Sequence, residues 1–194
     1  MLNEIKINDF TFKVWTGAFN KQALLQQLKK EDVGAIVVFG FDSFGIVDLS
    51  EEMAGVSKCL KPLSELSALT KSTIFAGIKT QILNVKHISV AVCGRGKVLD
   101  IVDRSCNILD DEYGASDKLK IFSSSFGMIG LLVDSDCLVE KTWQKVAPNC
   151  SVMLCVNRGS SSVIAEEVRL FSAAYNIPYI YMDDQGVEWN NLNS

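Results

Sequence analysis

The sequence has little of several features that mark specialised chains. Its 194 residues include only 3 prolines, 13 glycines and a single histidine. Collagen-like and low-complexity chains are far richer in Gly and Pro, so both classes are excluded. Hydrophobic residues make up 48% and charged residues 22%, the balance of an ordinary globular protein. We therefore expect one domain that spans residues 1–194.

Long apolar runs and basic stretches are also missing. The longest apolar runs, 35–39 and 128–133, fall far short of the roughly 20 residues that a membrane-spanning helix needs. Residues 1–10 lack the apolar core of a secretory signal. A formal charge of −4 and a pI near 5.1 leave no footprint for binding phosphate backbones. We expect a cytoplasmic protein that binds neither membranes nor nucleic acid.

The cysteines do not form a recognisable metal motif. No two of them are spaced as C-x-x-C, and His87 is the only histidine that could join them. A zinc site is therefore not expected, and reduced, mostly buried thiols are the usual state in the cytoplasm. We expect neither a metal nor a cofactor. The six are Cys59, Cys93, Cys106, Cys137, Cys150 and Cys155.

Hydrophobic patterning predicts strands that alternate with helices. Predicted strands are 10–14, 34–40, 73–78, 88–93, 98–102, 119–122, 128–133, 151–156 and 179–182. Predicted helices follow Asn20, cover 50–69 with an interruption at Pro62, cover 140–147, and follow the serines at 160–162. Helices alternating with strands in both halves, around a hairpin-rich middle, predict a layered α/β architecture.

Two glycine-containing turns have an alternative interpretation as anion-binding loops. Gly94-Arg95-Gly96-Lys97 superficially suggests a phosphate loop, but it lacks Walker spacing and is better explained as a hairpin connection. Asn157-Arg158-Gly159-Ser160 precedes a predicted helix, whose N–H groups could receive an anion, although a capping serine is the commoner arrangement.

Four segments in order carry a family pattern. They are the apolar strand 35–41; the Gly-x-Val strand 96–104; 119–122 with 126–136 and Glu140; and the helix 167–176 with 179–186. The third is similar to a Val-Phe, Gly-x-Ile-Gly-x-x-Ile-Cys-x-Asp, Pro-Glu signature. The pattern resembles the carbon–nitrogen hydrolase (nitrilase and amidase) superfamily over about residues 10–186.

The resemblance implies a fold and an assembly. The fold is a nitrilase-like four-layer α-β-β-α sandwich, and such proteins often dimerise through their helical faces, so we expect a homodimer. The chain stops shortly after Gly186, where family members usually continue through further strands. Uncovered strand edges would then favour association with another chain.

The residues that carry the family's chemistry are replaced here. The resemblance places Phe41 where members have a general-base Glu, Arg104 where they have a Lys, and Asp134 where they have the nucleophilic Cys. Phe41 cannot take a proton, and a guanidinium stays protonated at any working pH. We therefore expect a catalytically degenerate protein with a binding, regulatory or assembly role. We also expect Arg104 and Asp134 to form an ion pair beside Phe41. A guanidinium can bind a carboxylate through two hydrogen bonds, so this pair could be bidentate.

The alternatives are a hydrolase of non-peptide carbon–nitrogen bonds with a rebuilt site, and a purely structural subunit. A rebuilt site would use Asp134, Arg104, Asp42 or Cys137. A small-molecule ligand would bind at Arg104, Asp134 and Asp42. Asp42 is more readily explained by a turn, and Cys137 by buried packing.

Three polar residues have structural interpretations as well. His87 precedes an apolar strand and is expected at a surface turn rather than as a base. For Asp134 and Asp136, binding to backbone N–H groups and a role in a pocket are equally plausible.

Overall fold

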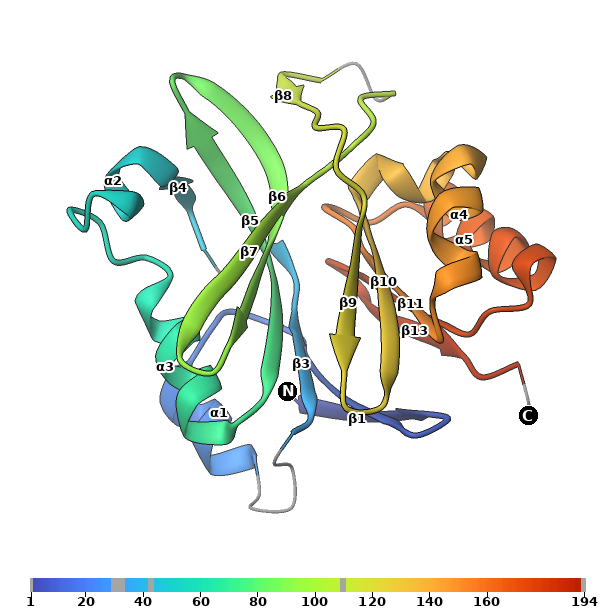
Figure 1. Ribbon diagram of the computed structural model, residues 1–194, viewed down its shortest axis with the longest axis horizontal. Helices are drawn as coiled ribbons and strands as arrows, with labels where there is room; N and C mark the ends of the chain where they lie inside the picture. Colours follow the sequence, from blue (N-terminus) through green and yellow to red (C-terminus); the bar gives the residue numbers. More distant parts are fainter. Residues whose placement is uncertain (1, 29–33, 42–43, 109–110, 193–194) are drawn as a thin grey trace.

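Two β-sheets lie face to face with helices on both outer sides (Figure 1). The computed structural model describes residues 2–28, 34–41, 44–108 and 111–192. The first sheet has the order β1-β2-β3-β5-β6-β7, with β4 beside β5 and β8 beside β6. Its strands are β1 (Leu2–Ile7), β2 (Phe10–Trp15), β3 (Ile36–Phe39), β4 (Ile46–Asp48), β5 (Thr73–Ile82), β6 (Val85–Gly94), β7 (Lys97–Asp103) and β8 (Tyr113–Gly114).

The second sheet has the order β13-β12-β11-β10-β9. Its strands are β9 (Lys120–Ser124), β10 (Gly127–Val133), β11 (Val152–Val156), β12 (Tyr179–Asp183) and β13 (Gly186–Asn190). The helices are α1 (Lys21–Gln27), α2 (Leu49–Met53), α3 (Lys61–Thr70), α4 (Glu140–Val146) and α5 (Ser162–Tyr175), with the short 3₁₀ helices η3 (Asp134–Leu138) and η4 (Ala147–Asn149).

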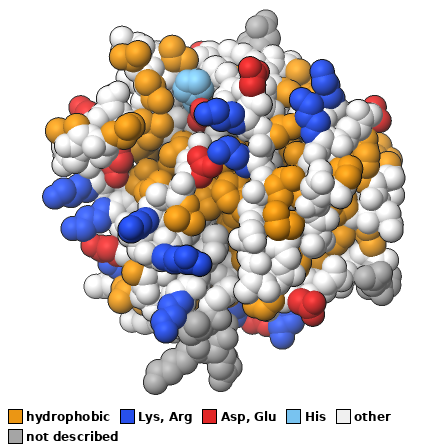
Figure 2. Space-filling model, viewed as in Figure 1, with side chains coloured by type: hydrophobic (Ala, Val, Ile, Leu, Met, Phe, Trp, Pro, Cys, Tyr) orange, Lys and Arg blue, Asp and Glu red, His pale blue; other side chains and the backbone are white. Residues whose placement is uncertain are grey.

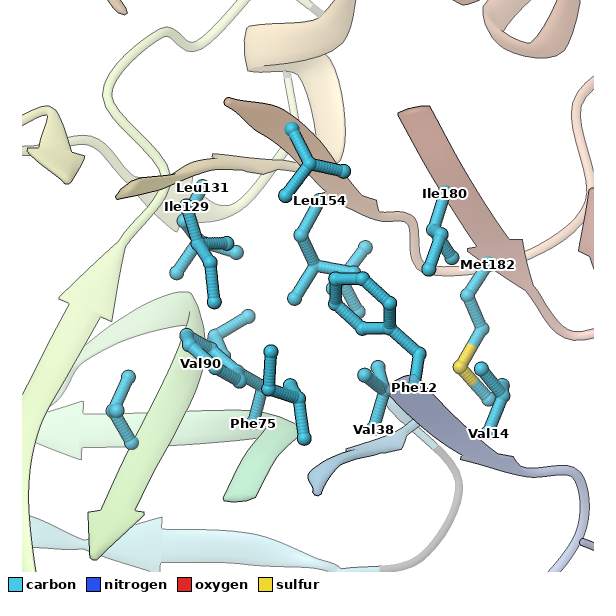
Figure 3. Packing of buried hydrophobic residues seen from close by; sticks show 14 of the residues in the cluster. Phe12, Val14, Val38, Phe75, Val90, Ile129, Leu131, Leu154, Ile180 and Met182 are labelled. Carbon is cyan, nitrogen blue, oxygen red and sulfur yellow. The ribbon is translucent and has the colours of Figure 1, made fainter. Parts of the chain in front are cut away.

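A continuous apolar core fills the space between the two sheets. Figure 3 shows Phe12, Phe75 and Val90 of the first sheet pointing toward Ile129 and Leu154 of the second. Each of these side chains is at most 1% exposed. Burial on this scale removes apolar surface from water and is the main force that holds the sheets together.

Two further cores join the helices to the outer faces of the sheets. Leu63 and Leu66 of α3 pack with Ile74 of the first sheet. Trp143 of α4 and Val168 of α5 pack against the second sheet in the same way. The layers therefore run helix, sheet, sheet, helix, which confirms the predicted four-layer α-β-β-α sandwich.

The structure differs from the predicted elements in several places. β1, β4 and β13 were not predicted, because these strands are short and partly exposed and lack a continuous apolar run. The predicted helix 50–69 is two helices, and Pro62 lies in the first turn of α3 instead of interrupting a helix. Proline is tolerated there because the first N–H groups of a helix have no intrahelical partner. The predicted cap Asn20 is present, and Ser161 is the serine that caps α5.

Among the helices of the described residues, none combines the length and the apolar character that crossing a bilayer requires.

Candidate functional site

The carboxyl ends of strands from both sheets gather at one edge of the sandwich. β2, β3 and β5 run parallel, as do β10, β11 and β12. β7 has the same direction as β5, because each is antiparallel to β6. Polar side chains follow several of these ends, among them Arg104 after β7, Asp134 after β10 and Asn157 after β11. In open α/β sheets such an edge is where ligands most often bind.

Arg104 lies at the centre of this edge and is completely buried. Its Nη1 donates to Asp134 Oδ2 at 2.9 Å, which confirms the ion pair predicted between these residues. The bidentate partner is a different carboxylate, Asp111, which accepts from Nη1 at 3.1 Å and from Nη2 at 2.7 Å. Asp111 has no motif around it in the sequence, so only the fold places it here.

A second arginine closes the cluster. Arg158 Nη2 donates to Asp111 Oδ2 at 2.8 Å, and its guanidinium lies 4.7 Å from the centre of the Tyr113 ring. Arg104 Nη2 also donates to the Tyr113 carbonyl at 2.8 Å. Two arginines thus face two carboxylates, Asp111 and Asp134, so the formal charge of the cluster is zero. We call these four residues the charge cluster.

The backbone at Asp134 adopts an uncommon conformation. Asp134 has a φ of +54°, in the left-handed region, at the point where β10 turns into η3. Its side chain is 1% exposed, and Oδ1 accepts from the Arg158 N–H at 3.3 Å. Strained positions of this kind are enriched at functional sites, because the surrounding structure must hold them in place.

Phe41 follows β3 at the same edge but belongs to the core between the sheets. Its side chain is 1% exposed and packs over Gly77, where an added Cβ would come within 2.8 Å of the ring. A cavity of about 300 Å³ opens beside it, bordered by Gly40, Met182 and the β12–β13 turn. The charge cluster does not contribute to the lining of this cavity.

Comparison with known proteins identifies the fold. Neither a family model nor a curated protein sequence matches the chain. Among solved structures, a carbon–nitrogen hydrolase from Helicobacter pylori is similar with a TM-score of 0.70 at 15% identity, over 89% of this chain and 72% of that one. An amidase from Nesterenkonia sp. gives 0.68 at 13% identity, over 96% of this chain and 82% of the other. A Saccharomyces cerevisiae member of branch 10 of the nitrilase superfamily gives 0.65 at 13%, over 87% and 72%.

This chain has the nitrilase-superfamily fold. The sequence resemblance predicted this fold, and the structural similarity confirms it.

Cys137, the alternative nucleophile considered from the sequence, is enclosed within this nitrilase fold. It is fully buried in the core between α4, α5 and the second sheet. A hydrogen bond with Cys155, together with burial, raises the pKa of the Cys137 thiol well above its usual range. The thiolate is the reactive form of cysteine, so this environment suppresses nucleophilic attack. Buried packing, the interpretation favoured from the sequence, is what the structure shows.

The other candidate residues have separate positions. Asp42 lies outside the described residues. His87 is inside β6 rather than at the surface turn predicted for it, because β6 begins three residues earlier than the apolar run. Its Nδ1 lies 3.9 Å from Asp103 Oδ2. In the part of the chain that is described, no three His, Cys, Asp or Glu side chains are grouped to hold a metal ion.

Asp136 holds the segment after Arg104 against the second sheet. Its Oδ1 accepts from the Ser105 N–H, the Ser105 hydroxyl and the Cys106 N–H, each at 2.8 Å. The side chain is 2% exposed, and this burial raises its pKa, against the lowering effect of the hydrogen bonds. Of the two roles considered for Asp136, the structure supports binding to backbone N–H groups.

Acid is expected to weaken the charge cluster through Asp111. The hydrogen bond from Arg104, followed by that from the Tyr113 N–H, holds the pKa of Asp111 well below its usual range. A folded-state pKa below the unfolded value of about 3.9 means that the stabilisation is complete above about pH 4 and is lost as the pH falls further. We expect Asp111→Asn to reduce the loss of unfolding free energy between about pH 4 and about pH 2, measured by urea unfolding.

Asp117→Asn is the control for this prediction, because Asp117 is exposed and outside the charge cluster. An Asp111→Asn protein with the same acid dependence as the wild type would show that Asp111 does not contribute.

Proposed function

We propose that this protein is a catalytically degenerate relative of the carbon–nitrogen hydrolases and that it acts by binding. The observation that carries the proposal is the pairing of Arg104 with Asp134 at the positions that the resemblance assigns to the catalytic Lys and Cys. Both side chains are at most 1% exposed, and their charges are balanced within the charge cluster. Neither is therefore available to attack a substrate or to move a proton.

The chemistry of carbon–nitrogen bond cleavage supports this proposal. Covalent catalysis needs a nucleophile and a base within hydrogen-bond reach of each other. A similar structure, the Nesterenkonia amidase, is described with an active site cysteine. In this chain Asp134 occupies the corresponding place in the sequence pattern, and its carboxylate is held by Arg104 and by the Arg158 N–H. Phe41 replaces the base with a buried apolar ring.

The cavity beside Phe41 is the place proposed for a ligand. It has a volume of about 300 Å³, which is at the lower end of the range for small-molecule sites. Phe41 and Met182 give it apolar walls, and Asp183 and Asp184 give it acidic groups. A small organic molecule with an apolar part and a hydrogen-bond donor fits this lining. Arg104 and Asp134, proposed from the sequence as binding residues, do not line this cavity and would instead stabilise the strand ends at the same edge of the sandwich.

An activity assay tests the proposal against a rebuilt hydrolase. Purified protein is incubated with butyramide, a short aliphatic nitrile and an N-carbamoyl amino acid, and ammonia release is measured. We expect no turnover above the uncatalysed rate. The control is Asp134→Ala, which removes the only carboxylate at the nucleophile position. Ammonia release by the wild type that Asp134→Ala abolishes would establish a hydrolase and overturn the proposal.

A further inference from the structure

A large groove lies at the opposite end of the sandwich from the charge cluster. Its volume is about 540 Å³. Its lining includes residues of the β6–β7 turn, the end of α3 and the β9–β10 turn, and Figure 1 shows where these elements lie. The side chains that matter to its chemistry are Lys71, Ser72, Arg95, Leu99, Ser123 and Ser125. The function proposed above uses none of these residues.

The lining of this groove is cationic. Lys71 and Arg95 are both exposed, and none of the described residues that line the groove has a carboxylate. Within the described part of the chain, neither cation forms an ion pair, whereas Lys21, Lys86 and Lys120 each pair with a carboxylate. Figure 2 shows basic side chains around the β6–β7 turn, at the lower left of the face. In a protein of net charge −4, this is a local excess of positive charge.

Hydroxyl groups and a small apolar floor complete the lining. Thr73, Ser123 and Ser125 contribute hydroxyl groups to the lining, whereas the hydroxyls of Ser72 and Ser124 donate to the carbonyls of Thr70 and Gly127. Ile36 and Leu99 supply the apolar surface. Hydroxyl donors beside two cations suit the several acceptor oxygens of a phosphate, and the apolar floor suits an attached organic group.

The same helix positions both cations. Lys71 caps the carboxyl end of α3 with a φ of +54°. Arg95 and Gly96, with φ of +53° and +77°, form the two-residue turn between β6 and β7, as the primed hairpin turns require. The Gly96 N–H donates to Ser67 Oγ of α3 at 3.0 Å, which ties this turn to the helix. The relative position of the two backbone segments that carry the cations is therefore set before any ligand arrives, which lowers the entropic cost of binding.

We propose that this groove binds a small phosphate-bearing molecule, with Lys71 and Arg95 on the phosphate and the organic group over Leu99. Its volume lies within the range of small-molecule sites. The proposal does not depend on whether the protein hydrolyses carbon–nitrogen bonds, because the charge cluster and the groove are at opposite ends of the sandwich. The turn 94–97, which the sequence indicated as a hairpin, would thus also contribute a cation to an anion site.

Titration with two probes tests the site. Adenosine 5′-monophosphate and inorganic phosphate are added to the full chain at low salt, and binding is followed by calorimetry and by amide shifts in NMR spectra. We expect saturable binding of both, tighter for the nucleotide, weaker as salt is raised, with shifted amides at 71–73, 94–99 and 123–125. Lys71→Asn and Arg95→Asn are each expected to weaken binding about tenfold or more, as for a lost charged hydrogen bond.

The variants are chosen so that the fold survives. Asparagine tolerates the left-handed backbone that both positions adopt, so each variant removes the charge without new strain. Lys118→Asn is the matched control, since Lys118 is exposed and does not line the groove. Unchanged binding in Lys71→Asn and Arg95→Asn, an equal loss in Lys118→Asn, shifts confined to other residues, or the absence of saturable binding would each overturn the proposal.

Discussion

Replacing Arg104 with alanine is expected to lower the free energy of unfolding by about 3–5 kcal/mol, as for other buried charges that lose their partner. Asp134 is 1% exposed and would keep its negative charge without the 2.9 Å bond from Nη1. Asp111 would lose two of its hydrogen bonds. Urea unfolding followed by circular dichroism measures the change directly.

Two further variants show whether the loss comes from the geometry of the charge cluster. Arg104→Lys keeps the charge but cannot reproduce the guanidinium fork, so its stability should lie between those of the wild type and the alanine variant. Arg169→Ala removes an exposed arginine that pairs with Glu188, and it should change stability little. A loss in Arg104→Ala no larger than that in Arg169→Ala would contradict the prediction.

Replacing Asp136 with alanine is expected to lower the free energy of unfolding by about 3 kcal/mol, because partly buried donors would be left without an acceptor. The Ser105 and Cys106 N–H groups both depend on this carboxylate, each at 2.8 Å. These residues directly follow Arg104, so the variant should also loosen the segment that leads to Asp111. Urea unfolding and hydrogen exchange of the Ser105 and Cys106 amides measure the two effects.

Asp136→Asn and Asp48→Ala are the comparisons for this second prediction. Asparagine retains an acceptor oxygen, so Asp136→Asn should lose less stability than the alanine variant. Asp48 accepts from the Ser50 and Glu51 N–H groups at the start of α2, an exposed helix cap, whose loss typically costs about 1 kcal/mol. The loss of unfolding free energy in Asp136→Ala should therefore exceed the loss in Asp48→Ala. Equal losses would argue against the burial of the two N–H donors as the cause.

Several parts of the fold follow directly from local sequence patterns. The glycine-bounded run at 34–40 and the apolar run at 128–133 become the buried strands β3 and β10. Asn20 and Ser161 begin helices, because their side-chain oxygens accept a backbone N–H that has no intrahelical partner. The edge strand β13 was not predicted, because its Gly-Val-Glu-Trp-Asn sequence is half exposed and has no apolar run.

The candidate site was predictable only in part. The pairing of Arg104 with Asp134 followed from their places in the family pattern, 30 residues apart. Asp111 and Arg158 could not be paired in this way, because Asp111 belongs to no motif and Arg158 was considered only as part of the turn 157–160 before a helix. Their roles arise because Asp111, after β7, contacts Arg158, after β11. A contact between segments that are distant in the sequence leaves no local signal in the chain.

The sequence by itself determined the layered α/β architecture of this protein, because burial patterns are local properties. Only the tertiary structure decided which charges meet. It paired Asp111 with Arg104, enclosed Cys137 and brought Lys71 and Arg95 to the lining of one groove, since contacts between distant segments depend on how whole sheets and helices pack.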